Sequence, residues 1–228
     1  MTAQYIIFVA ELVGIIAFAI SGVLVAIDHR LDLFGALVLG AVTAVGGGMT
    51  RDILIGQTPP VMFANPVYAI LAVAVSLFVF LLAYFSPNRF NLHGQRLMQI
   101  VNFFDALGLG VFVTVGVDAV LASDMAGNVF LAIFIGTITG VGGGMLRDIF
   151  VATIPAIFRK HIYALAAILG SAIYYYMVTF GLPVPVAIPV AVAAVVAIRV
   201  LAMRYRWNMP HVPLPEDARP PQEPRQNP

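Results

Sequence analysis

Seven runs of apolar residues, each about 20 residues long, account for most of the chain. They lie near 4–27, 33–56, 66–86, 98–120, 127–152, 161–180 and 184–203, and short segments with charged residues, Pro or Gly separate them. A helix needs about 20 apolar residues to cross roughly 30 Å of hydrocarbon. The runs are continuous and do not alternate as the strands of a membrane barrel do. The pattern therefore predicts an all-α membrane protein with seven transmembrane helices.

Composition agrees with this interpretation and excludes several classes of protein. Of the 228 residues, 61% are hydrophobic and 10% are charged, which is more apolar surface than a soluble fold can bury. The net charge of +1 provides no basic surface for a nucleic-acid partner. Because the chain has no Cys, it cannot form disulfides, iron–sulfur clusters or a thiolate nucleophile. No motif of a hydrolase, nucleotide-binding enzyme or metal site is present, so we expect no enzyme activity, no catalytic residue, no cofactor and no metal.

The basic residues between and after the apolar runs fall on one side of the predicted membrane domain. They are Arg30, Arg89, Arg96, Arg159, Lys160, Arg199, Arg204 and Arg206. Basic loops stay in the cytoplasm, so the N-terminus is predicted outside and the C-terminus inside. Residues 1–209 form the predicted membrane domain, and the segment 210–228, rich in Pro and charge, is predicted to be a disordered cytoplasmic tail.

An internal repeat dictates the architecture. The segment GAVTAVGGGMTRDI, which begins at Gly40, returns 96 positions later as GTITGVGGGMLRDI, which begins at Gly136. Glu11 on the first span corresponds to Asp105 on the fourth at an offset of 94 positions. Repeat one spans 4–86 and repeat two 98–180, and the seventh helix at 184–203 lies outside them. Since each repeat holds three spans, the second must enter the membrane upside down, as in many transporters and channels whose path runs between the halves.

Each repeat carries three consecutive glycines in the middle of a span: Gly46, Gly47 and Gly48 in repeat one, and Gly142, Gly143 and Gly144 in repeat two. Glycine lowers helix propensity by about 1 kcal/mol relative to alanine. We therefore expect the helix to bend or break there and to free carbonyls that line an ion path. The alternative is that the glycines permit close helix packing.

Charged residues follow each triplet inside the span: Arg51 and Asp52 in repeat one, and Arg147 and Asp148 in repeat two. A lone charge within the membrane costs at least ~2.5 kcal/mol, so these residues must be paired or hydrated. The inverted repeat favours cross-repeat pairs, Arg51 with Asp148 and Arg147 with Asp52. Such pairs would either take part in gating or clamp the two halves together.

Glu11 and Asp105 also lie within spans. If they face a pore they would attract cations, and otherwise they would be protonated and hydrogen-bonded within the bundle. The hydroxyl residues Ser21, Thr43, Thr114, Thr137, Thr139 and Ser171 are weaker candidates, because hydroxyls in membrane helices mostly bond their own backbone.

The seven spans, the inverted repeats and the doubled G-G-G-M-x-R-D segment together resemble the prokaryotic members of the TRIC family, the trimeric intracellular cation channels. The resemblance implies a homotrimer in the bacterial cytoplasmic membrane. It also implies a pore for monovalent cations, chiefly K⁺, within each protomer, and kinks at the two glycine triplets. Small helix faces that would suit close contact in a trimer contain Gly14, Gly22, Gly108, Gly110 and Gly116. Related bacterial sequences are called glycine transporters, which leaves a carrier of glycine or another small amino acid as the alternative to a passive cation channel.

Overall fold

The computed structural model describes residues 3–86, 95–159, 162–205 and 207. These residues form helices and turns, without a β-strand among them. The long helices are α1 (Ala3–Asp28), α2 (Leu33–Leu54), α4 (Val67–Phe85), α5 (Gln95–Leu121), α6 (Val129–Phe150), α8 (Ile162–Thr179) and α9 (Val184–Arg204). All seven are long and apolar enough to cross a membrane, so the predicted fold class and spans are confirmed. Arg89, Lys160, Arg206 and the predicted tail at 210–228 lie outside the described residues.

Two short helices that the sequence did not predict interrupt the connections after α2 and α6. They are α3 (Val61–Ala64) and α7 (Ala156–Arg159), and they occupy equivalent places in the two repeats. Each follows a proline-containing turn, and each is held to the end of the preceding long helix by a carboxylate of the site described below.

The repeats have the same helix ends. Asp32 caps α2 by accepting a hydrogen bond from the Gly35 amide at 2.8 Å, and Asn128 caps α6 by accepting one from Leu131 at 3.0 Å. After the two helices, Gly56 and Ala152 both have positive φ, 76° and 55°. The sequence repeat therefore reproduces local structure residue by residue.

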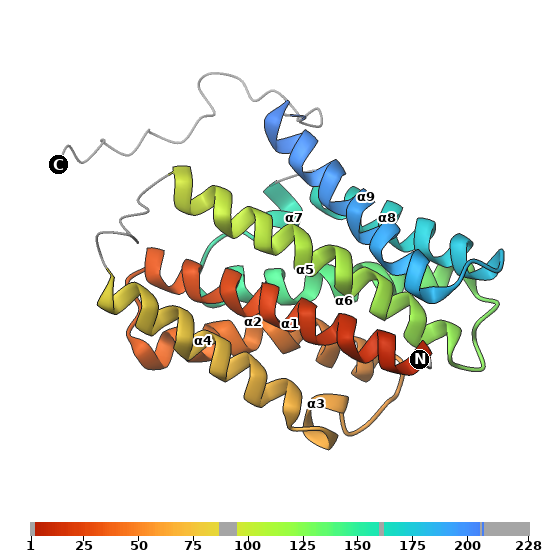
Figure 1. The fold of residues 1–228 in the computed structure, drawn as a ribbon, viewed down its shortest axis with the longest axis horizontal. Coiled ribbons are helices and arrows are strands. Elements are labelled where there is room, and N and C mark those ends of the chain that lie inside the picture. The colour runs from red at the N-terminus through yellow and green to blue at the C-terminus, as the bar shows by residue number, and fades with distance from the viewer. Residues whose placement is uncertain (1–2, 87–94, 160–161, 206, 208–228) are drawn as a thin grey trace, which may run out of the picture.

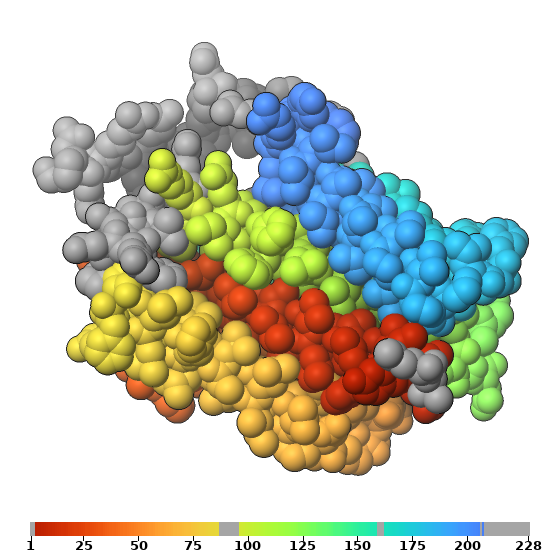
Figure 2. All heavy atoms as spheres, viewed as in Figure 1, coloured from red at the N-terminus to blue at the C-terminus, as the bar shows by residue number. Residues whose placement is uncertain are grey.

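The two halves pack together through equivalent helices. Helix α1 contacts α2 and α4 within repeat one, as α5 contacts α6 and α8 within repeat two, and the halves join where α1 packs on α5 and α2 on α6. Figure 1 shows α1 and α5 side by side and running in opposite directions, as an inverted repeat requires. Helix α9 packs on α5 and α8. In Figure 2, α1 lies between α4 and the pair α5 and α9.

The glycine triplets lie where α2 and α6 touch, and neither helix breaks there. Both α2 and α6 are continuous through their triplets. A Cβ on Gly47 would overlap the carbonyl oxygen of Thr139, and a Cβ on Gly143 would overlap that of Thr43. The predicted break with freed carbonyls is therefore wrong, and at Gly46, Gly47, Gly142 and Gly143 the packing alternative describes the structure. The cost of helical glycine, about 1 kcal/mol, is smaller than that of leaving backbone groups unpaired in an apolar interior.

The hydroxyl residues of α2 and α6 bond their own helices. Thr43 and Thr139 each donate to the carbonyl four residues earlier at 2.6 Å, and Thr137 does so at 2.7 Å. Thr114 on α5 donates to the Val111 carbonyl at 2.7 Å. This is the backbone role that was the alternative to lining a path.

The glycines considered for trimer contacts pack within the protomer instead. A Cβ on Gly14 would lie 3.0 Å from the Phe112 ring, and one on Gly110 would lie 3.2 Å from Val192 on α9. Gly22, Gly108 and Gly116 are similarly closed in by neighbouring helices of the same chain. The expectation that these glycines face other protomers is therefore wrong, and they give no support to a trimer.

Candidate functional site

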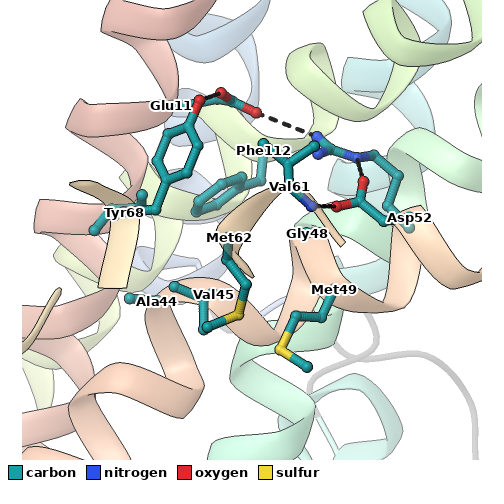
Figure 3. A pocket seen from close by; sticks show the side chains of 12 residues that line it. Glu11, Ala44, Val45, Gly48, Met49, Asp52, Val61, Met62, Tyr68 and Phe112 are labelled. Carbon is teal, nitrogen blue, oxygen red and sulfur yellow. Dashed lines mark hydrogen bonds and ion pairs between the residues drawn. The ribbon is translucent and has the colours of Figure 1, made fainter. Parts of the chain in front are cut away.

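A polar cluster in repeat one surrounds Arg51 near the end of α2. Its Nε donates to Asp52 Oδ1 at 2.8 Å, and its Nη1 lies 3.4 Å from Glu11 Oε1 on α1. The Tyr68 hydroxyl on α4 donates to the other Glu11 oxygen at 2.6 Å. Asp52 Oδ2 accepts from the Val61 amide at 2.8 Å and so fixes the start of α3. Figure 3 shows the Glu11 carboxylate between the Tyr68 hydroxyl and the guanidinium.

The equivalent cluster in repeat two surrounds Arg147 on α6. Its Nη1 donates to Asp105 Oδ1 on α5 at 2.8 Å, and its Nε and Nη2 donate to Asp148 Oδ1 at 2.9 and 2.8 Å. Asp148 Oδ2 accepts from the Ala156 amide at 2.8 Å, which fixes the start of α7. Arg147 Nη1 also donates to Ser21 Oγ on α1 at 2.7 Å, so this cluster reaches across to repeat one.

The sequence predicted the charged residues of the site but not their partners. Each arginine pairs with the aspartate next to it and with the carboxylate of the first helix of its own repeat. The predicted cross-repeat pairs, Arg51 with Asp148 and Arg147 with Asp52, are therefore wrong. An arginine side chain is long enough to fold back to its neighbour along the helix, and the intramembrane carboxylate of the same repeat supplies the second partner.

Burial makes these interactions expensive to disrupt. Arg51 is 5% exposed, Arg147 4%, Asp52 1% and Asp148 8%. Each guanidinium faces two carboxylates, and each aspartate also accepts a backbone hydrogen bond, which satisfies its second oxygen. Removing one member of such a buried set leaves an uncompensated charge at a cost of about 3–5 kcal/mol.

Each cluster faces a cavity. The first, about 30 Å³, is lined by Glu11, Arg51, Asp52, Tyr68 and Gly48 together with apolar residues that include Phe112 of repeat two. By volume it has room for about two water molecules. The second, about 210 Å³, is lined by Asp105, Arg147 and Asp148 together with residues that include Val25, Asp28 and His29 of α1.

The cavities lie toward opposite ends of the bundle. The first contains Glu11 from the beginning of α1 and the second contains Val25 from its end, a separation of about 21 Å along a helix. Midway between these two residues, Phe18 of α1 stacks on Phe112 of α5 with ring centroids 5.2 Å apart. Both rings are buried, at 0% and 4% exposure, so an apolar pair separates the two polar cavities.

Of the six triplet glycines, Gly48 lines the first cavity, and Gly144 lies against the second cluster. A Cβ on Gly144 would be 2.7 Å from the Tyr163 hydroxyl and 3.2 Å from Asp105 Oδ1. Gly46, Gly47, Gly142 and Gly143 lie in the contact between α2 and α6. The triplets therefore position the site mainly by bringing the two helices together.

Sequence reasoning missed the role of Arg199, which it counted among the basic residues that follow the seventh span. The structure places it inside α9 with 2% exposure. Its Nη2 lies 3.5 Å from Asp105 Oδ2, and its guanidinium carbon lies 4.4 Å from the centre of the Tyr163 ring. The signal was its position within the apolar run, where a lone charge needs a partner.

Within the part of the chain that the structure describes, no group of three or more His, Asp or Glu side chains is arranged to hold a metal ion. The acidic groups of the site are instead matched to guanidinium groups and backbone amides.

The fold and the paired clusters define a membrane protein built from two inverted three-helix repeats, an architecture of channels and transporters. A family model described as Glycine transporter matches residues 8–84 and 102–179, which are the two repeats. The UPF0126 inner membrane protein YadS of Escherichia coli K12 is 37% identical over 212 residues, 92% of this chain and 97% of that protein. A UPF0126 membrane protein of Vibrio cholerae is 33% identical over 206 residues, 90% of this chain and 82% of that protein. The chain belongs to this family of membrane proteins.

Solved structures give the same relationship. A prokaryotic TRIC channel in 0.5 M KCl has a TM-score of 0.80 and 34% identity, over 90% of this chain and 100% of that chain. The TRIC trimeric intracellular cation channel orthologue from Rhodobacter sphaeroides has a TM-score of 0.78 and 31% identity, over 89% of this chain and 99% of that chain. The resemblance to prokaryotic TRIC channels is therefore confirmed. These relatives are described as membrane proteins or channels and not as enzymes, in agreement with the sequence expectation.

Proposed function

We propose that the protein is a passive channel for monovalent cations, chiefly K⁺, with a pore inside each protomer between the two repeats. One observation carries the proposal: two cavities with carboxylate side chains face opposite ends of the bundle, and both repeats line each of them. Ions would enter through one cavity, pass the Phe18 and Phe112 pair, and leave through the other. The structural relatives of this chain are described as cation channels, which supports the same class of function.

The chemistry of the cavities favours cations. Glu11 lines the first cavity and Asp105 lines the second. A wet cavity with low-dielectric walls focuses on passing ions the field of any carboxylate charge that the neighbouring arginines leave unbalanced. In the described conformation the stacked rings of Phe18 and Phe112 form an apolar constriction, which stops ions by excluding water. Opening then requires these two rings to separate.

The assembly and location belong to the same proposal. A homotrimer in the bacterial cytoplasmic membrane, surrounded by lipid, follows from the Rhodobacter sphaeroides relative, which is described as a trimeric channel. An N-terminus outside and a C-terminus in the cytoplasm follow from the basic loops. Arg199 drops out of that count because it is buried, while Arg30, Arg96 and Arg204 remain exposed.

The alternative is a secondary transporter for glycine or another small amino acid, which the description of the matching family model favours. A carrier must enclose its substrate, and the first cavity of about 30 Å³ has room for about two waters. Glycine, with five heavy atoms, would have to use the larger second cavity.

Flux into liposomes that contain the purified protein tests the two functions together. A channel gives K⁺ flux driven by the K⁺ gradient alone, with no saturable uptake of labelled glycine. Saturable glycine uptake without K⁺ flux would contradict the proposal, and empty liposomes and the charge-pair variant Arg147→Gln provide the controls.

A further inference from the structure

The two polar clusters are alike in geometry but differ in charge, and the difference comes from one residue that has no counterpart in the repeat. Arg199 lies on α9, outside both repeats. We propose that Arg199 acts as a fixed counter-cation for Asp105, so that permeating cations are attracted at the Glu11 end of the pore and not at the Asp105 end. The inference rests on the proposed function.

The Asp105 end is electrically balanced. Asp105 and Asp148 face Arg147 and Arg199, which is a formal charge of zero. Exposed Asp28 and His29 lie at the mouth of this cavity, where water and salt screen them.

The Glu11 end is negative. Glu11 and Asp52 face Arg51, and Asp118 has Glu11 and Arg51 as charged neighbours. The two carboxylates and one guanidinium that line this cavity carry a formal charge of −1, and Asp118, which accepts a hydrogen bond from Tyr174 at 3.2 Å, lies outside the lining. Among the described residues, no second arginine reaches Glu11, whose other oxygen accepts from Tyr68 instead.

The setting of Arg199 fits a counter-cation better than a structural clamp. Among the described residues, its Nε and Nη2 have no hydrogen-bond partner, although the side chain is 2% exposed. Its contacts are an ion pair with Asp105 at 3.5 Å and the face of the Tyr163 ring at 4.4 Å, both of which select positive charge. A clamp would be expected to satisfy the fork of the guanidinium with hydrogen bonds.

Single-channel current–voltage curves in symmetric KCl test the inference. The measured quantity is the current carried by K⁺ that enters at the Glu11 end divided by the current of K⁺ that enters at the Asp105 end, at equal and opposite voltages. A cysteine introduced at exposed Ala122 reports the orientation of each channel through block by an impermeant thiol reagent, because the chain has no other Cys. The wild-type ratio should exceed one, and more so at low salt.

The variants should move this ratio in opposite directions. Arg199→Met removes the counter-cation but keeps the apolar stem, and should lower the ratio by about two-fold toward one. Asp105→Asn leaves Arg199 uncompensated and should raise the ratio. Arg199→Lys should keep the wild-type ratio, and Arg204→Met, which removes the same charge from an exposed site on the same helix, is the matched control.

A structural role predicts a different pattern, in which Arg199→Met and Asp105→Asn both lower the amount of folded channel and leave the ratio of the surviving channels unchanged. That result would overturn the inference.

If the wild type carries no cation current, the proposed function fails, and ion binding still tests the charge balance. Crystals soaked in RbCl should then show an anomalous peak beside Asp105 in Arg199→Met that the wild type lacks, and its absence from the variant would overturn the inference as well.

Discussion

Phe18 and Phe112 stack across the pseudo-two-fold axis with their ring centroids 5.2 Å apart, and each lies seven residues after the intramembrane carboxylate of its own repeat. Seven residues are about two helical turns, so each ring follows its carboxylate along nearly the same helix face. The repeat therefore places a polar cavity and one ring of the apolar pair in one unit, and inversion of the repeat puts the two rings in contact.

Removal of one ring should open the constriction. We expect Phe112→Ala to raise the open probability and the conductance of the channel, because a small side chain no longer keeps water out. The same change should lower stability by about 3–5 kcal/mol, as for other buried Phe→Ala substitutions. Planar-bilayer recordings measure the first effect and thermal unfolding in detergent the second. Phe130→Ala, at a side chain that is 79% exposed, is the control, and equal currents in the two variants would argue against a constriction at Phe112.

Larger side chains at the crossing of α2 and α6 should prevent folding. Gly47→Ala should destabilise the protein by about 1–3 kcal/mol, since the new Cβ meets backbone and cannot be accommodated by a rotamer change. Gly47→Leu and Gly143→Leu should lose folded protein and ion flux together. Size-exclusion chromatography and flux assays measure the two. Gly127→Ala, where a Cβ meets nothing within 4 Å, is the control, and folded but impermeable Leu variants would instead favour glycines that line the path.

Double-mutant cycles should find coupling within each repeat and not between repeats. The pair Arg51 and Glu11, and the pair Arg147 and Asp105, should show coupling energies of about 0.5–3 kcal/mol, as expected for residues in direct contact. The pair Arg51 and Asp148 should be additive. The free energy of unfolding measured for single and double neutralisations decides this, and strong coupling of Arg51 with Asp148 would contradict the described contacts.

The two tyrosines of the site should respond differently to the loss of their hydroxyls. Tyr68→Phe removes a hydrogen bond to the Glu11 carboxylate and should cost about 1.5–3 kcal/mol. Tyr163→Phe should be neutral or slightly stabilising, because its buried hydroxyl has no partner among the described residues. Each variant is the control for the other in a thermal-unfolding series, and equal destabilisation would contradict this difference between the repeats.

The fold could be predicted from the sequence because the bilayer leaves few options. Apolar run length gave the helix bounds to within a few residues, and the repeat with an odd number of spans gave the inversion. The short helices α3 and α7 could not be predicted in this way, since four residues carry no periodicity and depend on a carboxylate that binds their first amide.

The site was only partly predictable. Its charged residues stand out because charge is costly in a membrane, but their partners depend on side-chain reach and helix rotation, which spacing does not give. The glycine triplets were misread because low helix propensity is a weak effect beside the need to pair every backbone group. Arg199 was assigned to the segment after the seventh span because a charge near the end of a span can belong to either environment.

The most direct test of a passive cation channel is the reversal potential of single channels in planar bilayers across a KCl gradient. Unitary currents of the purified protein should reverse near the K⁺ equilibrium potential, and this cation preference should be lost when Glu11→Gln and Asp105→Asn are combined. A reversal potential set by Cl⁻, or saturable glycine uptake by protein that carries no unitary current, would contradict it.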